Sequence, residues 1–69
     1  MDYAENDKQN IINFVQTQGG ECNVSDIFNI ESIEKLRIYP LIYRMKDAGI
    51  LTITAFGEFG TPLKIKLIQ

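Results

Sequence analysis

With 69 residues, the chain is too short to enclose a large substrate cavity, because a domain of this size buries only about 60% of its unfolded surface on folding. Its 45% hydrophobic and 23% charged residues are ordinary for a globular protein, and no apolar run approaches the ~20 residues that a membrane span requires. The net charge is -2, and the acidic N-terminus lacks the basic start and apolar core of a signal peptide, so we expect a soluble cytoplasmic protein.

The charge is unevenly distributed along the chain. Residues 1–34 carry one lysine and seven carboxylates, whereas residues 35–69 carry six lysines or arginines and two carboxylates. This asymmetry suggests one face that meets a polyanion and another that repels it. A solvated surface whose sign varies along the chain is the alternative interpretation.

The residues of common metal and catalytic sites are scarce. Cys22 is the single cysteine and cannot form an internal disulfide, and the absence of histidine removes the usual zinc ligand sets. We expect Cys22 to be buried or half-buried; a reactive thiol is the minor interpretation, because no nearby cation would lower its pKa. The carboxylates are scattered and no glycine-rich loop precedes a helix, so we expect neither an enzyme nor a bound cofactor or metal.

The first predicted helix follows a short N-terminal arm, residues 1–5, and opens a single domain of residues 6–69. Asn6 and Gln9 have the spacing at which each side chain caps the other's backbone amide. An apolar stripe follows, with amide side chains opposite it, and consists of Ile11, Ile12, Phe14 and Val15. A pair of glycines ends the helix.

A second, shorter helix is predicted after a brief extended segment at residues 21–22. Asn23 and Asp26 repeat the capping pattern at its start. One side of this helix is apolar and is expected to be buried, and it consists of Val24, Ile27 and Phe28.

The third predicted helix begins near Lys35 or Leu36, which leaves Pro40 close to the first turn, where a missing amide hydrogen is tolerated. Its apolar side chains recur at helical spacing and are Ile38, Leu41, Ile42, Met45 and Ala48. Gly49 is expected to end the helix in the left-handed conformation, which only glycine adopts without steric cost.

From residue 51 the period changes to two, which predicts a β-hairpin. The first strand has an apolar side of Leu51, Ile53 and Ala55, and the returning strand has one of Leu63, Ile65 and Leu67. Residues 56–62 form the turn, where glycines are free to take positive φ. Three helices and a hairpin wing, with the brief strand that winged helices often place near residues 21–22, predict an α+β winged helix-turn-helix.

The third predicted helix carries Tyr39-Pro40 near its start and runs through Gly49 into an apolar strand, and in these residues the chain resembles the DNA-binding domain of the PadR family of bacterial transcriptional regulators. The pair Tyr39-Pro40 is the distinctive feature, because many winged helices share the apolar residues around it. The matching positions, within about residues 36–68, are Tyr39, Pro40, Leu41, Met45, Gly49, Ile50, Leu51, Pro62, Lys64 and Lys66. The resemblance implies a DNA-binding module of a transcriptional regulator. The family's His-Gly-Tyr type motif and C-terminal dimerisation helix have no counterpart here, so only the module is carried over.

The third helix is the candidate for entry into the major groove of duplex DNA. At ~100° per residue, the positions opposite its buried stripe are Leu36, Pro40, Tyr43 and Asp47. Arginines can meet base edges and lysines chiefly phosphates. The predicted DNA-binding residues are Lys35, Arg37, Tyr39, Tyr43, Arg44, Lys46, Lys64 and Lys66. An ordinary solvated helix face is an equally weighted interpretation, and DNA binding requires the cations of helix and wing to share one face.

A protein partner is the alternative to DNA. The sequence pI of about 4.9 and a wing tip of Glu58 and Phe59 fit DNA poorly, and exposed apolar side chains more often mark protein contacts. A homodimer or another protein would be held through Leu36, Tyr39, Tyr43, Phe56 and Phe59. Because one module buries only ~600–1,000 Å² on DNA, specific DNA binding also favours a dimer.

Overall fold

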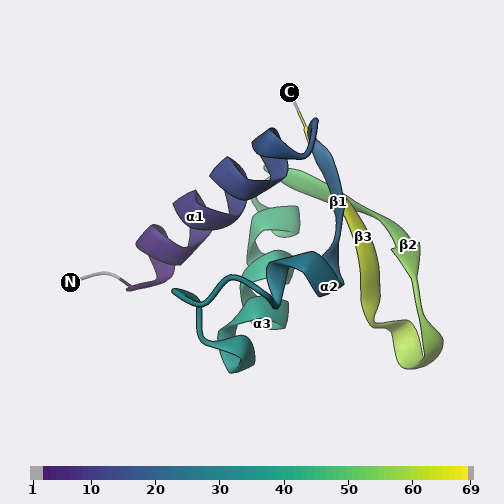
Figure 1. The fold of residues 1–69 in the computed structure, drawn as a ribbon. Coiled ribbons are helices and arrows are strands. Elements are labelled where there is room, and N and C mark those ends of the chain that lie inside the picture. The colour runs from purple at the N-terminus through teal and green to yellow at the C-terminus, as the bar shows by residue number, and fades with distance from the viewer. Residues whose placement is uncertain (1–2, 69) are drawn as a thin grey trace.

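Within residues 3–68, three helices and a three-stranded antiparallel sheet form the protein, which confirms the expected α+β class. The structure is a computed structural model and describes residues 3–68. In chain order the elements are α1 (Tyr3–Thr17), β1 (Glu21–Asn23), α2 (Val24–Ile27), α3 (Lys35–Asp47), β2 (Leu51–Phe56), the 3₁₀ turn η1 (Glu58–Gly60) and β3 (Pro62–Leu67). Figure 1 shows the helices on one side of the sheet, with the β2–β3 hairpin, called the wing below, extending from the body. Within the described residues, no helix combines the length and apolar character needed to cross a membrane.

β3 is the central strand of the sheet, whose order is β1-β3-β2. Both neighbours run antiparallel to it, so that Cys22 of β1 and Ile53 of β2 each lie opposite Ile65. This pairing confirms the brief strand expected near residues 21–22. Ile65 is fully buried, and strand alternation places the lysine on either side of it on the solvent face.

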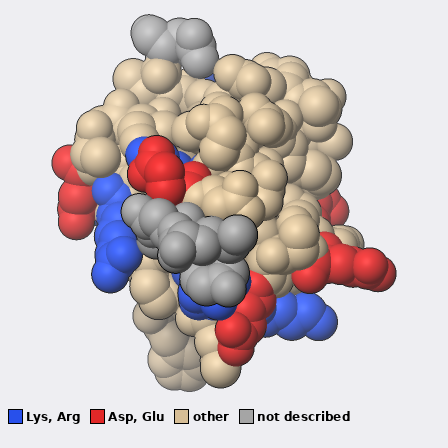
Figure 2. All heavy atoms as spheres, turned by 90° about the vertical axis from the view of Figure 1, so that its left-hand side faces the viewer, with Lys and Arg blue, Asp and Glu red and all other residues tan. Residues whose placement is uncertain are grey.

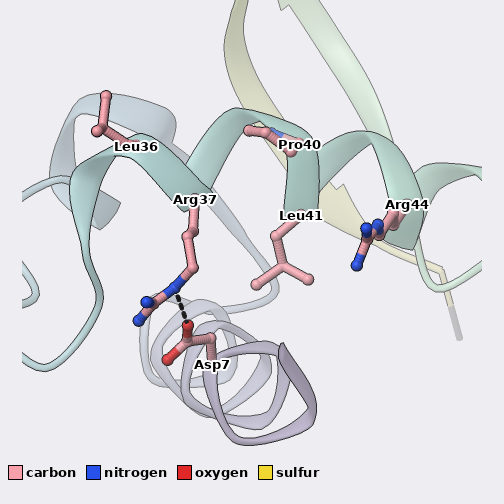
Figure 3. Close-up of a pocket in the computed structure, with 6 residues that line it drawn as sticks. All are labelled: Asp7, Leu36, Arg37, Pro40, Leu41 and Arg44. Atoms are coloured by element: carbon pink, nitrogen blue, oxygen red, sulfur yellow. Dashed lines mark hydrogen bonds and ion pairs between the residues drawn. The ribbon is translucent and has the colours of Figure 1, made fainter. Parts of the chain in front are cut away.

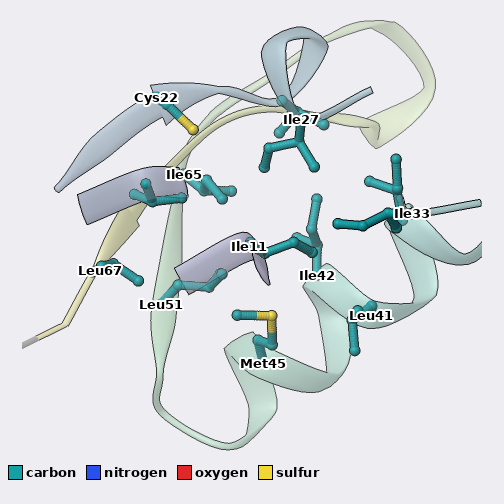
Figure 4. Close-up of a cluster of buried hydrophobic side chains, with 13 residues drawn as sticks. Ile11, Cys22, Ile27, Ile33, Leu41, Ile42, Met45, Leu51, Ile65 and Leu67 are labelled. Carbon is teal, nitrogen blue, oxygen red and sulfur yellow. The ribbon is translucent and has the colours of Figure 1, made fainter. Parts of the chain in front are cut away.

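The core lies between the helices and the inner face of the sheet (Figure 4). Side chains at helical spacing on α1 and α3 meet the inward side chains of β2 and β3. The buried apolar residues are Ile11, Val15, Cys22, Val24, Ile27, Ile33, Ile38, Leu41, Ile42, Met45, Leu51, Ile65 and Leu67. One core therefore draws on every helix and strand, and it confirms the expected burial of Cys22.

α1 begins earlier than the sequence predicts. It starts at Tyr3, inside the predicted arm of residues 1–5, whose first two residues lie outside the described part of the chain. The predicted capping pair is wrong, because Asn6 lies within the helix and the Gln9 amide donates to Asn13 Oδ1 at 3.0 Å. That contact and an ion pair at i, i+3 spacing stabilise a longer helix than the capping pattern implies.

α2 is a single helical turn that follows β1 directly. Asn23 is its N-cap residue, as predicted, but its side chain forms no capping hydrogen bond. Val24 and Ile27 are buried, whereas Phe28 is only partly buried. Core packing, and not a side-chain cap, therefore holds this short helix in place.

α3 begins at Lys35, as predicted, and Pro40 lies in its second turn, close to the first. Pro40 is exposed, on a side of the helix where water can replace the missing backbone hydrogen bond. The predicted buried stripe is confirmed at Ile38, Leu41, Ile42 and Met45. Ala48 is exposed instead, because it caps the helix beyond the last buried turn.

Gly49 ends α3 as the sequence predicts. Its φ is 76°, in the left-handed region that favours glycine. The amide of Ile50 then donates to the carbonyl of Met45 at 2.9 Å, and the Gly49 amide donates to Lys46 at 3.0 Å. These two bonds satisfy carbonyls at the helix end and direct the chain into β2.

The wing departs from simple alternation near its tip. Leu63, predicted on the apolar side of the returning strand, is half-exposed, whereas Pro62, predicted in the turn, is buried at the start of β3. The pairing of β2 with β3 shifts register between Ile53 and Phe56, which turns the strand locally and exchanges the faces of the side chains.

The wing turn also uses its glycines differently from the prediction. Gly60 has a positive φ of 76°, as expected, but Gly57 is extended. A side chain at Gly57 would approach Leu63 to 3.1 Å, so this glycine serves a close contact. Phe59 takes the second positive φ, 63°, and is the one non-glycine residue to do so within residues 3–68.

Candidate functional site

Arg37, a predicted DNA-binding residue, is held against α1 by an ion pair. Its Nε donates to Asp7 Oδ2 at 2.9 Å, and its Nη1 donates to Glu34 Oε2 at 3.1 Å. Asp7 is only 2% exposed, so its carboxylate has little access to water. The pair joins helices that are 30 residues apart in sequence. Arg37 therefore neutralises a buried carboxylate and anchors α3 to α1.

Arg44 lies on the same side of α3 as Arg37. Figure 3 shows both arginines and Leu41 directed toward α1, with Leu36 and Pro40 on the other side of the helix. A small pocket of about 170 Å³ along this part of α3 is lined by these five residues together with Asp7 of α1. The side of α3 that carries Arg37, Leu41 and Arg44 is called the α1-facing flank below.

The positions of α3 opposite its buried stripe, called the outward line below, carry no cation. As predicted, Leu36, Pro40, Tyr43 and Asp47 are exposed there. Leu36 is 84% exposed and projects an aliphatic side chain into solvent. A ligand that approached α3 from the side of the outward line would contact an aliphatic side chain, a proline and a tyrosine before any positive charge.

The opposite side of α3, called the wing-facing flank below, meets the hairpin. The Tyr43 hydroxyl donates to the Gly60 carbonyl at 3.2 Å and so links the helix to the wing tip. The Tyr39 ring packs edge-on against Phe28 of the α2 end, with ring centroids 5.1 Å apart. Both tyrosines are thus held by the fold while more than a third of each remains exposed.

A groove of about 310 Å³ separates the wing from α2 and α3. Its surface is mostly apolar and has one cation at the edge. The lining residues, which define the wing groove, are Asn23, Val24, Ser25, Tyr39, Ala55, Pro62, Leu63 and Lys64. Lys64 and Tyr39, both predicted site residues, are therefore brought together, on the flank opposite Arg37 and Arg44.

The remaining predicted cations are exposed but dispersed. Lys46 lies 3.9 Å from Asp47, and Lys66 lies opposite Glu21 in the strand register. Lys35, Arg44, Lys64 and Lys66 form no ion pair with another residue of the described chain. The face seen from the α1 side intersperses Lys and Arg with Asp and Glu (Figure 2). The cations therefore flank the outward line of α3 and are not gathered on the single face that was expected.

Cys22 is not a reactive centre. Burial raises the pKa of its thiol, and the nearby carboxylates of Asp26 and Glu21 raise it in the same direction, to about 11 in all. The thiolate is the nucleophilic form, so the thiol is inert at neutral pH. This agrees with the expected structural role in the core.

Two features of the site escaped the sequence prediction. Asp7 lies four residues before Ile11 and eight before Val15, so its place on the buried stripe of α1 was a signal that it needs a buried partner. The exposure of Leu63 and the resulting wing groove had no such signal, because they depend on the register shift within the wing.

No family model, curated protein or solved structure matches the chain. The likeness to PadR-family domains accordingly remains an expectation from a few residues around Tyr39 and Pro40. Inferences about function depend on the geometry of α3 and the wing.

Proposed function

We propose that the chain is a winged helix-turn-helix module that binds duplex DNA, of the kind found in transcriptional regulators. The order of the helices, the antiparallel sheet and the exposed outer side of α3 are compatible with that fold. In this arrangement α3 approaches the major groove, and the wing approaches the neighbouring backbone.

The observation that carries the proposal is a set of cations on both sides of α3 that form no ion pair with another residue of the described chain. Arg44 stands on the α1-facing flank and Lys64 in the wing groove. Lys35, at the start of α3, and Lys66, in β3, are also exposed. The strands of DNA that border a major groove present phosphates on both sides of an inserted helix. The cations stand on two flanks of α3 and not on the one face that the sequence argument required, so the proposal depends on phosphate contacts on both sides of the helix instead.

The same geometry predicts weak sequence preference. Arg37 is engaged with two carboxylates, and Leu36 and Tyr43 occupy the outward line where base edges would be met. Phosphate contacts therefore dominate, and they carry no sequence information. We expect dissociation constants on the order of 10⁻⁴–10⁻⁶ M near physiological salt, as for non-specific binding.

The test is titration of a fluorescent random-sequence duplex over a series of salt concentrations. Four phosphate contacts predict a slope of about -3.6 in log K against log salt, so affinity should fall about a hundredfold between 50 and 200 mM. Arg44→Ala and Lys64→Ala should each lower the slope by about one.

Lys8→Ala is the matched control, because it removes the same charge from a cation of α1 that is already paired with Glu5 at 2.8 Å. Its salt slope should equal that of the unmodified protein. Binding that is absent at 20 mM salt, or a slope that Arg44→Ala and Lys64→Ala leave unchanged, would contradict the proposal.

A protein-contact module is the second candidate function. It is favoured by the exposed apolar side chains of Leu36, Phe56 and Phe59, which are 84%, 57% and 99% exposed. Exposed aromatic and aliphatic side chains are more typical of protein contacts than of phosphate contacts. In the DNA titration this candidate predicts no binding that depends on salt.

A further inference from the structure

We infer that a second copy of the chain binds at the wing, with Phe59 of each copy seated in the wing groove of the other. This interface goes beyond DNA binding and does not depend on it. Four features of the described residues support it: a rigidly presented aromatic side chain, a groove that accepts it, complementary charges beside the two, and sufficient apolar area.

Phe59 is presented to solvent by a well-held turn. Its side chain is 99% exposed, although its backbone has a positive φ that side chains other than those of Asn and Asp rarely adopt. The turn is closed by the Gly57 amide, which donates to the Thr61 carbonyl at 2.8 Å. The Tyr43 hydroxyl, bound to Gly60, fixes the turn against α3. An aromatic residue that is disfavoured both by its conformation and by its exposure is explained by a partner.

The wing groove is a suitable receptor for that side chain. At about 310 Å³ it is large enough for one aromatic ring, and Tyr39, Pro62 and Leu63 give it an apolar surface. Its floor is preformed, because Tyr39 is held by Phe28 and Pro62 is buried. Phe59 of the same chain does not fill it, since that side chain is almost completely exposed.

The charges beside the aromatic residue and the groove are complementary. Glu58 precedes Phe59 in the wing turn, and Lys64 borders the groove. Neither side chain forms an ion pair with another described residue. If Phe59 of one copy enters the groove of another, Glu58 approaches Lys64, and the reciprocal pair forms at the same time.

A second copy is favoured over an unrelated partner because the chain carries both halves of the contact on one hairpin. A two-fold axis beside the wing brings each Phe59 to the other copy's groove and closes the assembly at two subunits. The exposed apolar area near the wing is on the order of 500 Å² per copy, taking roughly 150–250 Å² for a fully exposed aromatic side chain. It is contributed by Tyr39, Tyr43, Phe56, Phe59 and Leu63. Two such surfaces reach about 1,000 Å², the lower limit for a specific interface, so the dimer should be weak.

This dimer and the proposed DNA complex compete for the same residues. Tyr39 and Lys64 are covered in the dimer, and both are among the predicted DNA contacts. DNA should therefore lower the dimer population if both proposals hold. Because self-association is measured without DNA, its failure leaves the DNA titration unaffected, and the reverse is also true.

The first experiment is sedimentation velocity of the full chain from about 5 to 500 μM. We expect a reversible transition from one-chain to two-chain mass within this concentration range. Phe59→Gly should weaken the dimer at least about tenfold, because it removes the aromatic anchor. Glycine is favoured at positive φ, so this variant should melt at or above the temperature of the unmodified protein, which separates lost association from lost folding.

The second experiment exchanges the charges. Glu58→Lys and Lys64→Glu should each self-associate at least about tenfold more weakly, because each places like charges across the interface. An equimolar mixture of the two variants should restore a dimer near the original affinity, since each cation then faces an anion of the other chain. A merely structural role for either residue does not produce this rescue.

Ile68→Ala is the control, because Ile68 is 52% exposed and lies beyond β3, at the end of that strand away from the wing turn. It should leave the dimer affinity unchanged. One-chain mass at every concentration would overturn the inference. So would a dimer that is indifferent to Phe59→Gly, a mixture of charge variants that stays monomeric, or a ladder of masses above two chains.

Discussion

The two flanks of α3 use their polar side chains in opposite ways. On the α1-facing flank, Arg37 meets a carboxylate of Asp7 that is almost completely buried, at 2.9 Å. On the wing-facing flank, the Tyr43 hydroxyl makes one hydrogen bond to the wing turn, while Lys64 has no carboxylate partner among the described residues. On the first flank Arg37 is held by contacts within the chain while Arg44 stays exposed, and the second flank leaves a mostly apolar groove open.

This difference separates stability from recognition within one helix. A cation that neutralises a buried carboxylate contributes to folding, because removing it leaves a charge without access to water. A cation beside an open groove contributes little to folding but remains available to a ligand. The sequence alone offers Arg37 and Lys64 as equivalent candidates, whereas the structure gives them different tasks.

Arg37→Ala should have the largest effect on stability. It leaves Asp7 buried without its cation, and we expect a loss of about 1–3 kcal/mol in the free energy of unfolding. The matched change on an exposed cation, Lys35→Ala, should cost no more than about 0.5 kcal/mol. Urea unfolding followed by circular dichroism measures both. Equal losses for the two variants would mean that the α1-facing flank is not an anchor.

Cys22 makes the free energy of unfolding depend on pH. Its side chain lies in the core that the helices and the sheet share, so the effect concerns the whole domain and not one flank of α3. The unfolded thiol loses its proton near the ordinary pKa of 9.0, while the native thiol keeps it until about 11. The unfolded state therefore binds fewer protons between these values, so native stability is complete below pH 9 and falls as pH rises toward 11.

The comparison is urea unfolding of the unmodified protein and Cys22→Ala at pH 8, 9 and 10. We expect the advantage of the cysteine to shrink by on the order of 1 kcal/mol over this range. The Phe59→Gly variant, which keeps Cys22, should show the same decline in stability between pH 8 and 10. A difference between the cysteine and alanine proteins that stays constant with pH would show that the thiol is not held in a desolvated site.

Tyr43→Phe should have the smallest effect. It removes an exposed hydrogen bond to Gly60, which we expect to contribute about 0.5 kcal/mol to stability. Its local consequence is faster amide hydrogen exchange in residues 57–61, because the wing turn loses its tie to α3. Tyr39→Phe leaves that bond in place and is the control. Unchanged exchange in the wing turn would mean that its own backbone bonds suffice to order it.

Local signals predicted most of the elements. The helical spacing of Ile38, Ile42 and Met45 and the glycine at position 49 correctly place the body and end of α3. These features depend on a few neighbouring residues and on the conformational preferences of each. The start of α1 was wrong by three residues because weakly structured polar sequence permits several helix starts of similar free energy.

The amino-acid pattern was enough to indicate three helices, a hairpin and an apolar core, since periodicity and turn residues act over short distances. The partner of Arg37 lies 30 residues earlier in the chain, and the groove beside Lys64 exists because a register shift exposes Leu63. Both follow from how separate elements pack together. Charge and burial at a side chain depend on neighbours in space, so the folded arrangement was needed to tell the anchoring arginine from the cations left for a ligand.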